Sequence, residues 1–207
     1  MDIEVFLTPS TVADDDVKGK TAVVIDVLRS SSTIISALDA RARAVIPVVD
    51  GEEAGKIASN LDPSTYVLGG ERNGTKIEGY QLGNSPREYT EEVVEGKTVI
   101  FNTANGARAF GKAAAADKLV VGSFLNAHRV ADFVRETAQD TVFICAGQQN
   151  RISLDDILCV GLILDRLWDE QMPAHLTDAT YVAYTTYQRS TDRWKEAVHN
   201  CTHASTL

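Results

Sequence analysis

The chain has 207 residues, of which 44% are hydrophobic and 24% charged, a composition typical of a globular protein. Its formal net charge of −9 at pH 7 argues against a nucleic-acid-binding surface, which would be basic. No apolar run approaches the roughly 20 residues that cross a bilayer, and the first residues lack the pattern of a signal peptide. We therefore expect a cytoplasmic protein whose partners include neither nucleic acid nor membrane.

Apolar runs and helical patterns alternate along the chain. We expect strands at residues 4–7, 22–26, 45–49, 66–68, 98–101, 119–122 and 141–145. Helical patterns cover residues 34–40, 52–60, 107–116, 127–136, 154–168, 174–188 and 192–199. This alternation predicts an α/β fold with a largely parallel or mixed sheet flanked by helices on both faces, a three-layer α/β/α arrangement. The length fits a single unit over residues 1–207, or two tightly packed α/β lobes within it.

The segment from Val23 to Thr33 carries the strongest functional signal. A buried-looking strand ends on Asp26, Arg29 follows, and a run of four hydroxyl residues precedes the next helical pattern. In an open α/β sheet, ligands bind at the carboxyl ends of the strands, and a helix start suits a phosphate or another oxyanion. Asp26 is therefore a candidate metal ligand or nucleophile. The alternative is ordinary turn and helix-cap chemistry, in which these side chains only stabilise the backbone.

Other predicted strands also end in polar or glycine-rich turns, at residues 69–72, 102–106, 122–126 and 145–147. Because the carboxyl ends of parallel strands point the same way, we expect these turns to converge on one rim. The rim would carry the carboxylates of Asp26 and Glu71, whose oxygens suit Mg²⁺. It would also carry the guanidinium groups of Arg29 and Arg72, which suit phosphate or sulfonate oxygens. Each turn taken alone also fits a purely structural role.

Asp155 and Asp156 open a predicted helix soon after the strand that ends at residue 145. The helix dipole explains acidic residues in a first turn, so we expect Asp155 to be an ordinary first-turn acid. Asp156 is a candidate metal ligand that could reach the rim. The apolar stripe of the same helix is expected to be core, with a homodimer interface as the alternative.

The cysteines and histidines indicate no further site. The three cysteines form no CxxC pair, so neither a disulfide framework nor a zinc site is expected, and Cys145 and Cys159 are predicted to lie in the core. The late histidines His175, His199 and His203 lack the spacing of metal ligands. We expect them to be surface or internally satisfied side chains.

Six motifs follow one another in an order that resembles a known family. They are VIDVLRSSST at 24–33, GGER at 69–72, GYQLGNSP at 79–86, TANGARA at 103–109, GSFLN at 122–126 and CAG at 145–147. With flanking residues from Phe6 to Asp156, they resemble the 2-phosphosulfolactate phosphatase (ComB) family. The resemblance implies an α/β fold and Mg²⁺-dependent hydrolysis of (R)-2-phospho-3-sulfolactate to 3-sulfolactate and phosphate, a step toward coenzyme M.

Three departures from the family pattern bear on the site. Ser30-Ser31-Ser32 stands where the family often has Ala-Thr-Thr or Ala-Thr-Ser, so hydroxyl groups persist. Asn102 and Ala107 stand near positions where the family often has threonine, which weakens the case for a threonine contact there. Family members also continue past the position of Leu207, so we expect a shortened C-terminus that affects stability or one edge of the site.

The predicted site belongs to a phosphomonoester hydrolase that acts on a small anionic phosphorylated substrate. The predicted catalytic set is Asp26, Arg29, Glu71 and Arg72. The predicted Mg²⁺ ligands are Asp26, Glu71 and Asp156, and oxygen ligands of this kind also accept Mn²⁺. The predicted substrate contacts are Ser30, Ser31, Ser32, Thr33, Asn84, Ser85, Asn105, Gly106, Ser123 and Asn126.

Three alternatives stay open at this point. Asp26 could be a nucleophile that forms an aspartyl phosphate, although Leu28 stands where the haloacid-dehalogenase phosphatases carry a second aspartate. The substrate could be another small phosphorylated acid. The chain could also be a non-catalytic anion-binding module, because a fold does not determine a function.

Overall fold

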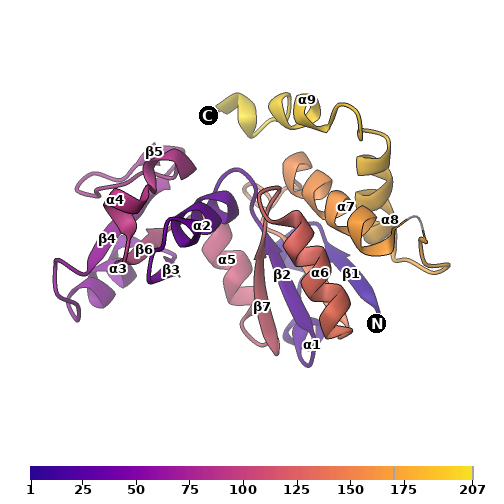
Figure 1. Ribbon diagram of the computed structural model, residues 1–207, viewed down its shortest axis with the longest axis horizontal. Helices are drawn as coiled ribbons and strands as arrows, with labels where there is room; N and C mark the ends of the chain where they lie inside the picture. Colours follow the sequence, from indigo (N-terminus) through magenta and orange to yellow (C-terminus); the bar gives the residue numbers. More distant parts are fainter. Residues whose placement is uncertain (170, 207) are drawn as a thin grey trace.

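The computed structural model describes residues 1–169 and 171–206 of the chain. Its strands are β1 Ile3–Phe6, β2 Thr21–Ile25, β3 Ala44–Val48, β4 Tyr66–Arg72, β5 Thr75–Lys76, β6 Thr98–Asn102, β7 Lys118–Gly122 and β8 Thr141–Cys145. They form two four-stranded sheets, of order β1-β8-β2-β7 and β3-β6-β4-β5 (Figure 1). The β4–β5 pair is antiparallel, and the other pairs are parallel.

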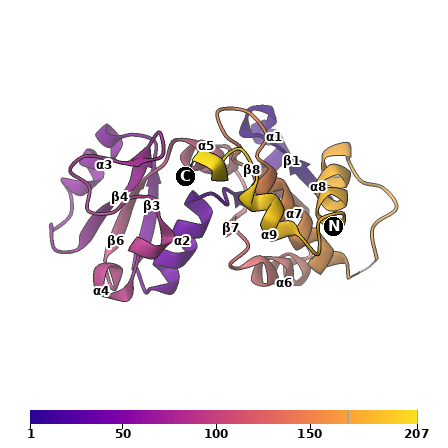
Figure 2. The ribbon, with the colours of Figure 1, turned by 90° about the horizontal axis from the view of Figure 1, so that it is seen from above.

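Helices cover both faces of both sheets (Figures 1 and 2). They are α1 Asp14–Val17, α2 Ser30–Asp39, α3 Gly51–Ala58, α4 Glu91–Val94, α5 Ala104–Ala113, α6 Ala127–Thr137, α7 Leu154–Trp168, α8 Asp178–Gln188 and α9 Trp194–His199. Short 3₁₀ turns at Pro9–Thr11, Pro86–Glu88 and Ala204–Thr206 complete the described elements.

Helices α2 and α5 form a layer shared by the two sheets (Figure 1). The chain passes from the first sheet to the second through α2 and returns through α5. Ile34 and Ala37 of α2 pack against the second sheet, whereas Ala109 and Ala113 of α5 pack with the first. Phe110 contacts the apolar clusters of both sheets. The two sheets are therefore joined by a common apolar layer.

Strand β2 lies at the centre of the first sheet, and all five of its residues are buried. Val23 and Ile25 face the cluster that contains α6 and α7, whereas Ala22 and Val24 face the cluster that contains α5. This alternation follows from the two-residue period of a strand. Because helices cover both faces, the strand is apolar from Ala22 to Ile25, which explains the uninterrupted run up to Asp26.

The apolar stripe of α7 belongs to the core, as the sequence predicted. Ile157, Val160, Leu164 and Leu167 are buried, and they pack with β2, β8 and α6. Gly161 lies where α7 and α8 approach most closely, since a Cβ atom there would be 2.4 Å from the Ala183 carbonyl oxygen. The expected burial of Cys145 and Cys159 is confirmed as well.

The predicted α/β class is confirmed, with mostly parallel strands and helices on both faces. Each of the seven predicted strands is present, but the strands divide between two sheets. Helix α2 begins at Ser30 and α5 at Ala104, three or four residues earlier than their apolar patterns indicated. The first turns of both helices carry small and polar side chains, which give no apolar periodicity. No described helix is long and apolar enough to cross a membrane.

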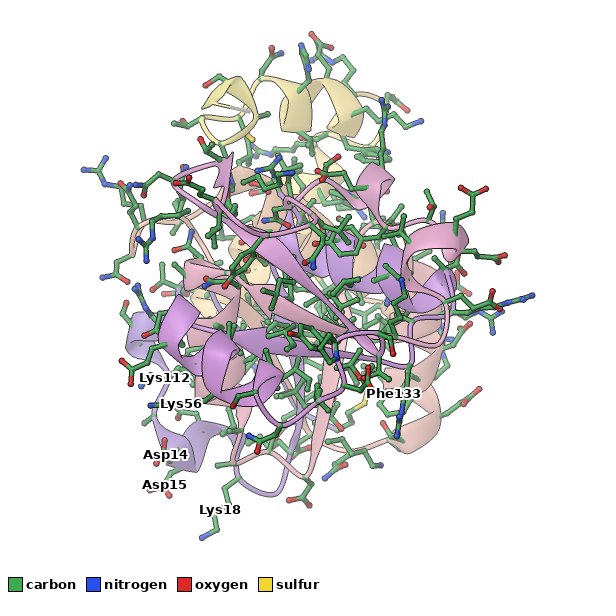
Figure 3. The ribbon with its side chains drawn as sticks, turned by 90° about the vertical axis from the view of Figure 1, so that its left-hand side faces the viewer. Asp14, Asp15, Lys18, Lys56, Lys112 and Phe133 are labelled. Atoms are coloured by element: carbon green, nitrogen blue, oxygen red, sulfur yellow. The ribbon has the colours of Figure 1, made fainter. Side chains whose placement is uncertain are left out.

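The acidic helix α1 lies at the end of the molecule opposite the C-terminal helix (Figures 1 and 3). Asp14, Asp15 and Lys18 extend from this end in Figure 3. Asp14 and Asp15 are exposed there. Part of the net charge of −9 therefore lies at the end of the molecule away from α9.

Replacing Gly161 by alanine is expected to destabilise the protein by about 1–3 kcal/mol, the usual cost of overpacking a core. The added methyl group would lie 2.4 Å from both the Ala183 carbonyl oxygen and the Tyr187 Cβ atom. Urea unfolding of the variant measures this cost. The matched control is Gly111→Ala in α5, where an added Cβ meets nothing within 4 Å. That variant is expected to gain up to about 1 kcal/mol, because alanine favours the helix.

Candidate active site

The carboxyl ends of β2 and β6 meet in one polar cluster. Ser30 Oγ and Thr103 Oγ1 are 2.7 Å apart, so a hydrogen bond links the start of α2 to the residue before α5. Gly106, in the first turn of α5, lies next to the Asp26 carboxylate. A Cβ atom at Gly106 would be 3.0 Å from Asp26 Oδ2, so glycine leaves room for this carboxylate between the two helix starts.

Asp26 is a buried carboxyl group, with 5% of the residue exposed. Burial raises its pKa from 3.8 to about 7, and the negative charges of Asp155 and Glu71 act in the same direction. Hydrogen bonds from Ser30 oppose the shift. The protonated and charged forms of Asp26 therefore coexist near neutral pH, which suits a group that binds a cation or exchanges a proton during a reaction.

Asp155 and Asp156 hold the turn that follows Asp26. Asp156 accepts hydrogen bonds from the backbone N–H groups of Val27, at 2.8 Å, and Gly147, at 3.0 Å. Asp155 accepts one from the N–H of Leu28 at 3.1 Å. The peptide bond that follows Leu28 is cis. Burial raises the pKa of Asp156 well above its ordinary value, and the charge of Asp155 adds to this effect. Both aspartates thus attach the start of α7 to the end of β2.

The hydroxyl run at 30–33 forms the first turn of α2 and bonds mainly to the protein. Ser31 Oγ accepts from the Asp26 N–H at 2.9 Å, and Ser32 Oγ donates to the Val27 carbonyl at 2.8 Å. Thr33 Oγ1 donates to the Asn84 carbonyl at 3.1 Å. Ser30 is the member of the run that lies beside the Asp26 carboxylate. A substrate contact by the other three hydroxyls stays a prediction.

A polar pocket of about 500 Å³ opens beside this cluster. Its walls include the predicted residues Glu71, Arg72 and Asn105. Arg29 contacts the same wall, because its Nη2 lies 3.1 Å from Glu71 Oε2 and donates to the Gly74 carbonyl at 3.2 Å. Arg72 and Arg108 also line the pocket, which gives it two further cationic groups for an anionic ligand.

Among the ten predicted substrate contacts, only Asn105 lines this pocket. Ser123 and Asn126 close the turn after β7, where Asn126 Oδ1 accepts from the Ser123 N–H at 2.9 Å and Asn126 Nδ2 donates to the Val121 carbonyl. Asn84 is buried, and its Oδ1 has no hydrogen-bond partner among the described residues. Ser85 precedes the 3₁₀ turn at Pro86–Glu88. Their contact with substrate stays a prediction.

Sequence reasoning missed two charged or titratable residues of the pocket. Arg108 lies in the quoted TANGARA motif, so that motif already contained the signal for it. His203 was expected at the surface or internally satisfied, yet it lines the pocket. Burial lowers the pKa of His203, although the charges of Asp155 and Glu71 oppose the shift. No spacing in the sequence connects this residue to Asp26.

The predicted Mg²⁺ ligands Asp26, Glu71 and Asp156 stay a prediction. Among residues 1–169 and 171–206, no group of three or more His, Cys, Asp or Glu side chains is placed to hold a metal ion. Asp156 uses both carboxylate oxygens to accept backbone N–H groups. Asp26 and Glu71 are the acidic groups left at the pocket side, and Mg²⁺ needs only one or two carboxylates when water and substrate phosphate supply the rest. This donor set fits the ion.

The fold and this pocket define an α/β protein with an arginine-lined polar pocket at the carboxyl ends of its strands. The sequence model of the 2-phosphosulpholactate phosphatase family matches residues 6–207. The chain belongs to this family.

Curated relatives agree with this assignment, and three of them are each named "Probable 2-phosphosulfolactate phosphatase". The protein of Caldanaerobacter subterraneus subsp. tengcongensis is 42% identical over 192 residues, which cover 92% of this chain and 80% of that protein. The Clostridium acetobutylicum protein is 41% identical over 192 residues, or 93% and 81% of the two chains. The Clostridium novyi protein is 37% identical over 207 residues, or 100% and 87%.

The raised pKa of Asp26 predicts a pH-dependent effect on stability. A carboxyl group whose folded-state pKa exceeds its unfolded value supports the fold below the unfolded pKa, and this support is lost as the pH rises through the folded pKa. For Asp26 the window runs from about pH 4 to about pH 7. In metal-free buffer, Asp26→Asn is therefore expected to raise the melting temperature relative to wild type at pH 8.

The difference in melting temperature between Asp26→Asn and wild type should shrink toward pH 4. Each unit of pKa shift corresponds to about 1.4 kcal/mol of stability. Thermal unfolding followed by circular dichroism at both pH values measures it. Asp39→Asn, at the exposed far end of α2, is the matched control and should show no pH-dependent gap. A gap of equal size at pH 4 and pH 8 would contradict the raised pKa.

Proposed function

We propose that this protein hydrolyses (R)-2-phospho-3-sulfolactate to 3-sulfolactate and inorganic phosphate. The observation that carries the proposal is the polar pocket at the strand ends, which Glu71, Arg72 and Arg108 line. Asp26 does not line it, but its buried carboxyl group is close enough to Glu71 for the two charges to interact. Membership of the 2-phosphosulpholactate phosphatase family and the names of the relatives support the same substrate.

The charge of the substrate matches the cations at the pocket. A phosphate, a sulfonate and a carboxylate on a three-carbon skeleton need several positive partners, and the pocket offers Arg72 and Arg108 directly. Arg29 contacts the wall of the pocket through its ion pair with Glu71. Because the protein as a whole carries a charge of −9, these local cations are what makes an anion favourable here. Arginine binds phosphate and sulfonate oxygens through two parallel hydrogen bonds.

We further propose that the reaction depends on Mg²⁺, held by Asp26 and, directly or through water, by Glu71. The chemistry that a divalent cation supplies in such a site is neutralisation of phosphoryl charge and activation of water. A cation also offsets the unfavourable proximity of the Asp26, Glu71 and Asp155 carboxylates, whose mutual repulsion contributes to the raised pKa of Asp26. Mn²⁺ has the same ligand preference and is the alternative ion.

The residues of the chain mainly bind and orient the phosphoryl group. Phosphoryl transfer requires little covalent work from a protein, so positioning and charge stabilisation account for most of the rate. Arg72 and Asn105 are proposed to orient the substrate oxygens, and the first turn of α5 presents backbone N–H groups to the same pocket. The alternative role for Asp26 is a nucleophile that forms an aspartyl phosphate.

A second candidate function keeps the chemistry and changes the substrate. The pocket residues recognise negatively charged oxygens, and arginine binds a carboxylate as well as it binds a sulfonate. Another small phosphorylated acid therefore fits the same pocket. A place in coenzyme M synthesis and a cytoplasmic location are proposals that depend on the sulfonate substrate and on the host.

The direct test is phosphate release from 2-phospho-3-sulfolactate with and without Mg²⁺, beside 2-phosphoglycerate and phosphoenolpyruvate. Selective release that requires the ion supports the proposal. Release only from the sulfur-free acids supports the second candidate. No release from any of them by a folded sample, together with measurable phosphate binding, would indicate an anion-binding module.

Asp26→Asn is expected to lower turnover at least tenfold while the protein stays folded, because the charged carboxyl group is lost. Steady-state kinetics with a circular dichroism check measures this, and Asp39→Asn is again the control. Turnover above a tenth of the wild-type value would contradict the role of Asp26. Acid quench of the wild-type reaction separates the two roles, since a trapped phosphoenzyme supports the nucleophile.

Arg72→Ala is expected to raise KM roughly 10- to 100-fold, the typical effect of losing one charge-assisted hydrogen-bond partner. The matched control is Arg87→Ala, because Arg87 is exposed and does not line the pocket. Initial rates over a range of substrate concentrations give both constants. An unchanged KM in Arg72→Ala would exclude a direct contact with the substrate.

A further inference from the structure

The segment after α9, residues 200–205, lies over the junction between the two sheets (Figures 1 and 2). The ring of Trp194, at the start of α9, stacks on Phe124 with centroids 4.4 Å apart and an interplanar angle of 18°. Helix α9 also packs against α7, and the first turn of α7 carries Asp155 and Asp156. Residues 194–205 are therefore held beside the pocket by contacts with α7 and with the turn after β7.

Cys201 attaches this segment to the site. It is buried, with 4% exposed, and its thiol donates to Asp155 Oδ1 at an S–O distance of 3.8 Å. The Ala204 N–H donates back to the Cys201 sulfur at 3.4 Å, which closes the turn that carries residues 202 and 203. Asp155 also accepts the Leu28 N–H, so one carboxylate connects the C-terminal segment to the turn after Asp26.

His203 is the side chain that this turn brings to the pocket wall. The charges of Asp155, Glu71 and Arg29 act on the pKa of its half-buried imidazole, and these residues come from three different parts of the chain. Arg72, Asn105 and Arg108 line the same pocket. A neutral imidazole offers one N–H donor and one acceptor, so it can donate to an oxygen of a bound anion.

We infer that His203 contacts the bound substrate by donating a hydrogen bond to one of its anionic oxygens, and that Cys201 positions it through Asp155. The C-terminal segment is thus part of the active site. The identity of the anion rests on the proposed function, whereas the contact itself needs only an oxyanion in the pocket.

The first test uses inorganic phosphate as the probe and the imidazole Cε1–H resonances of the protein as the readout. His203→Asn identifies the His203 resonance by its loss. Added phosphate is expected to shift this resonance along a saturable curve and to leave the resonance of exposed His199 in place. A His203 resonance that stays fixed at every phosphate concentration overturns the inference.

The second test uses kinetics with 2-phospho-3-sulfolactate. His203→Ala is expected to lower kcat/KM about 10- to 100-fold, the effect of losing one hydrogen bond to a charged oxygen. His203→Asn, which keeps an N–H donor, should recover part of this loss. His199→Ala, at the end of α9, is the matched control and should retain wild-type kinetics.

Variants of Cys201 distinguish the proposed positioning role of Cys201 from the proposed substrate contact of His203. Cys201→Ala is expected to lower kcat/KM less than His203→Ala does, while Cys201→Ser keeps a donor for Asp155 and restores activity. Melting temperatures of all variants show whether they are folded. A Cys201→Ser variant no better than Cys201→Ala, with both folded, would overturn the positioning role.

The two proposals fail in different ways. Wild-type protein that releases no phosphate from any substrate, yet shows the His203 shift with phosphate, would refute the hydrolase function and retain the inference. Wild-type protein that hydrolyses the substrate, with His203→Ala unchanged in both kcat and KM, would refute the inference and retain the function.

Discussion

The hydrogen bonds of Asp155 and Asp156 fix the turn after β2, on which the positions of Asp26 and of the C-terminal segment depend. These two carboxylates are buried at the start of α7 and accept the N–H groups of Val27, Leu28 and Gly147. Buried carboxylates are unfavourable unless hydrogen bonds replace the lost water, so the turn after β2 has to keep its N–H groups directed at α7. The position of Asp26 at the pocket and the attachment of the C-terminal segment both follow from this arrangement.

The shared layer of α2 and α5 explains why the pocket forms between two sheets. Each helix starts at the carboxyl end of a strand from a different sheet, and the Ser30–Thr103 hydrogen bond joins the two starts. A parallel sheet alone would present its strand ends along one edge. Two sheets that share their helices bring both sets of strand ends to one place, with Gly106 leaving space for the Asp26 carboxylate.

Much of the fold could be predicted from the sequence because burial leaves a periodic signal. The uninterrupted run at β2 and the stripe of α7 are apolar since helices or strands cover them, and both predictions are confirmed. The division into two sheets could not be predicted, because parallel strands of either sheet have the same apolar pattern. The start of α2 was placed too late, since Ser30 to Thr33 carry no apolar residue.

The candidate site was predicted where a residue lies next to its motif in the chain. Asp26 follows β2 directly, and Glu71 and Arg72 are the last residues of β4. Glu71 and Arg72 line the pocket and Arg29 pairs with Glu71, whereas Asp26 lies beside Gly106 outside the lining, and the roles of all four stay predictions. The hydrogen bonds of Asp156 reach residues 129 and 9 positions away, which no local pattern encodes. His203 was missed for the same reason, since its place depends on a contact between Cys201 and Asp155.

The strand pairings also set the order in which the protein can assemble during synthesis. All strands of the second sheet lie between residues 44 and 102, so they can pair once about half of the chain has been made. Strand β2 pairs with β7 and β8, and β1 pairs with β8 alone, so β2 has no strand partner until residue 122 has left the ribosome, and the first sheet is complete only after residue 145. Until β7 is made, the apolar run before Asp26 is the stretch of the nascent chain most in need of protection from aggregation.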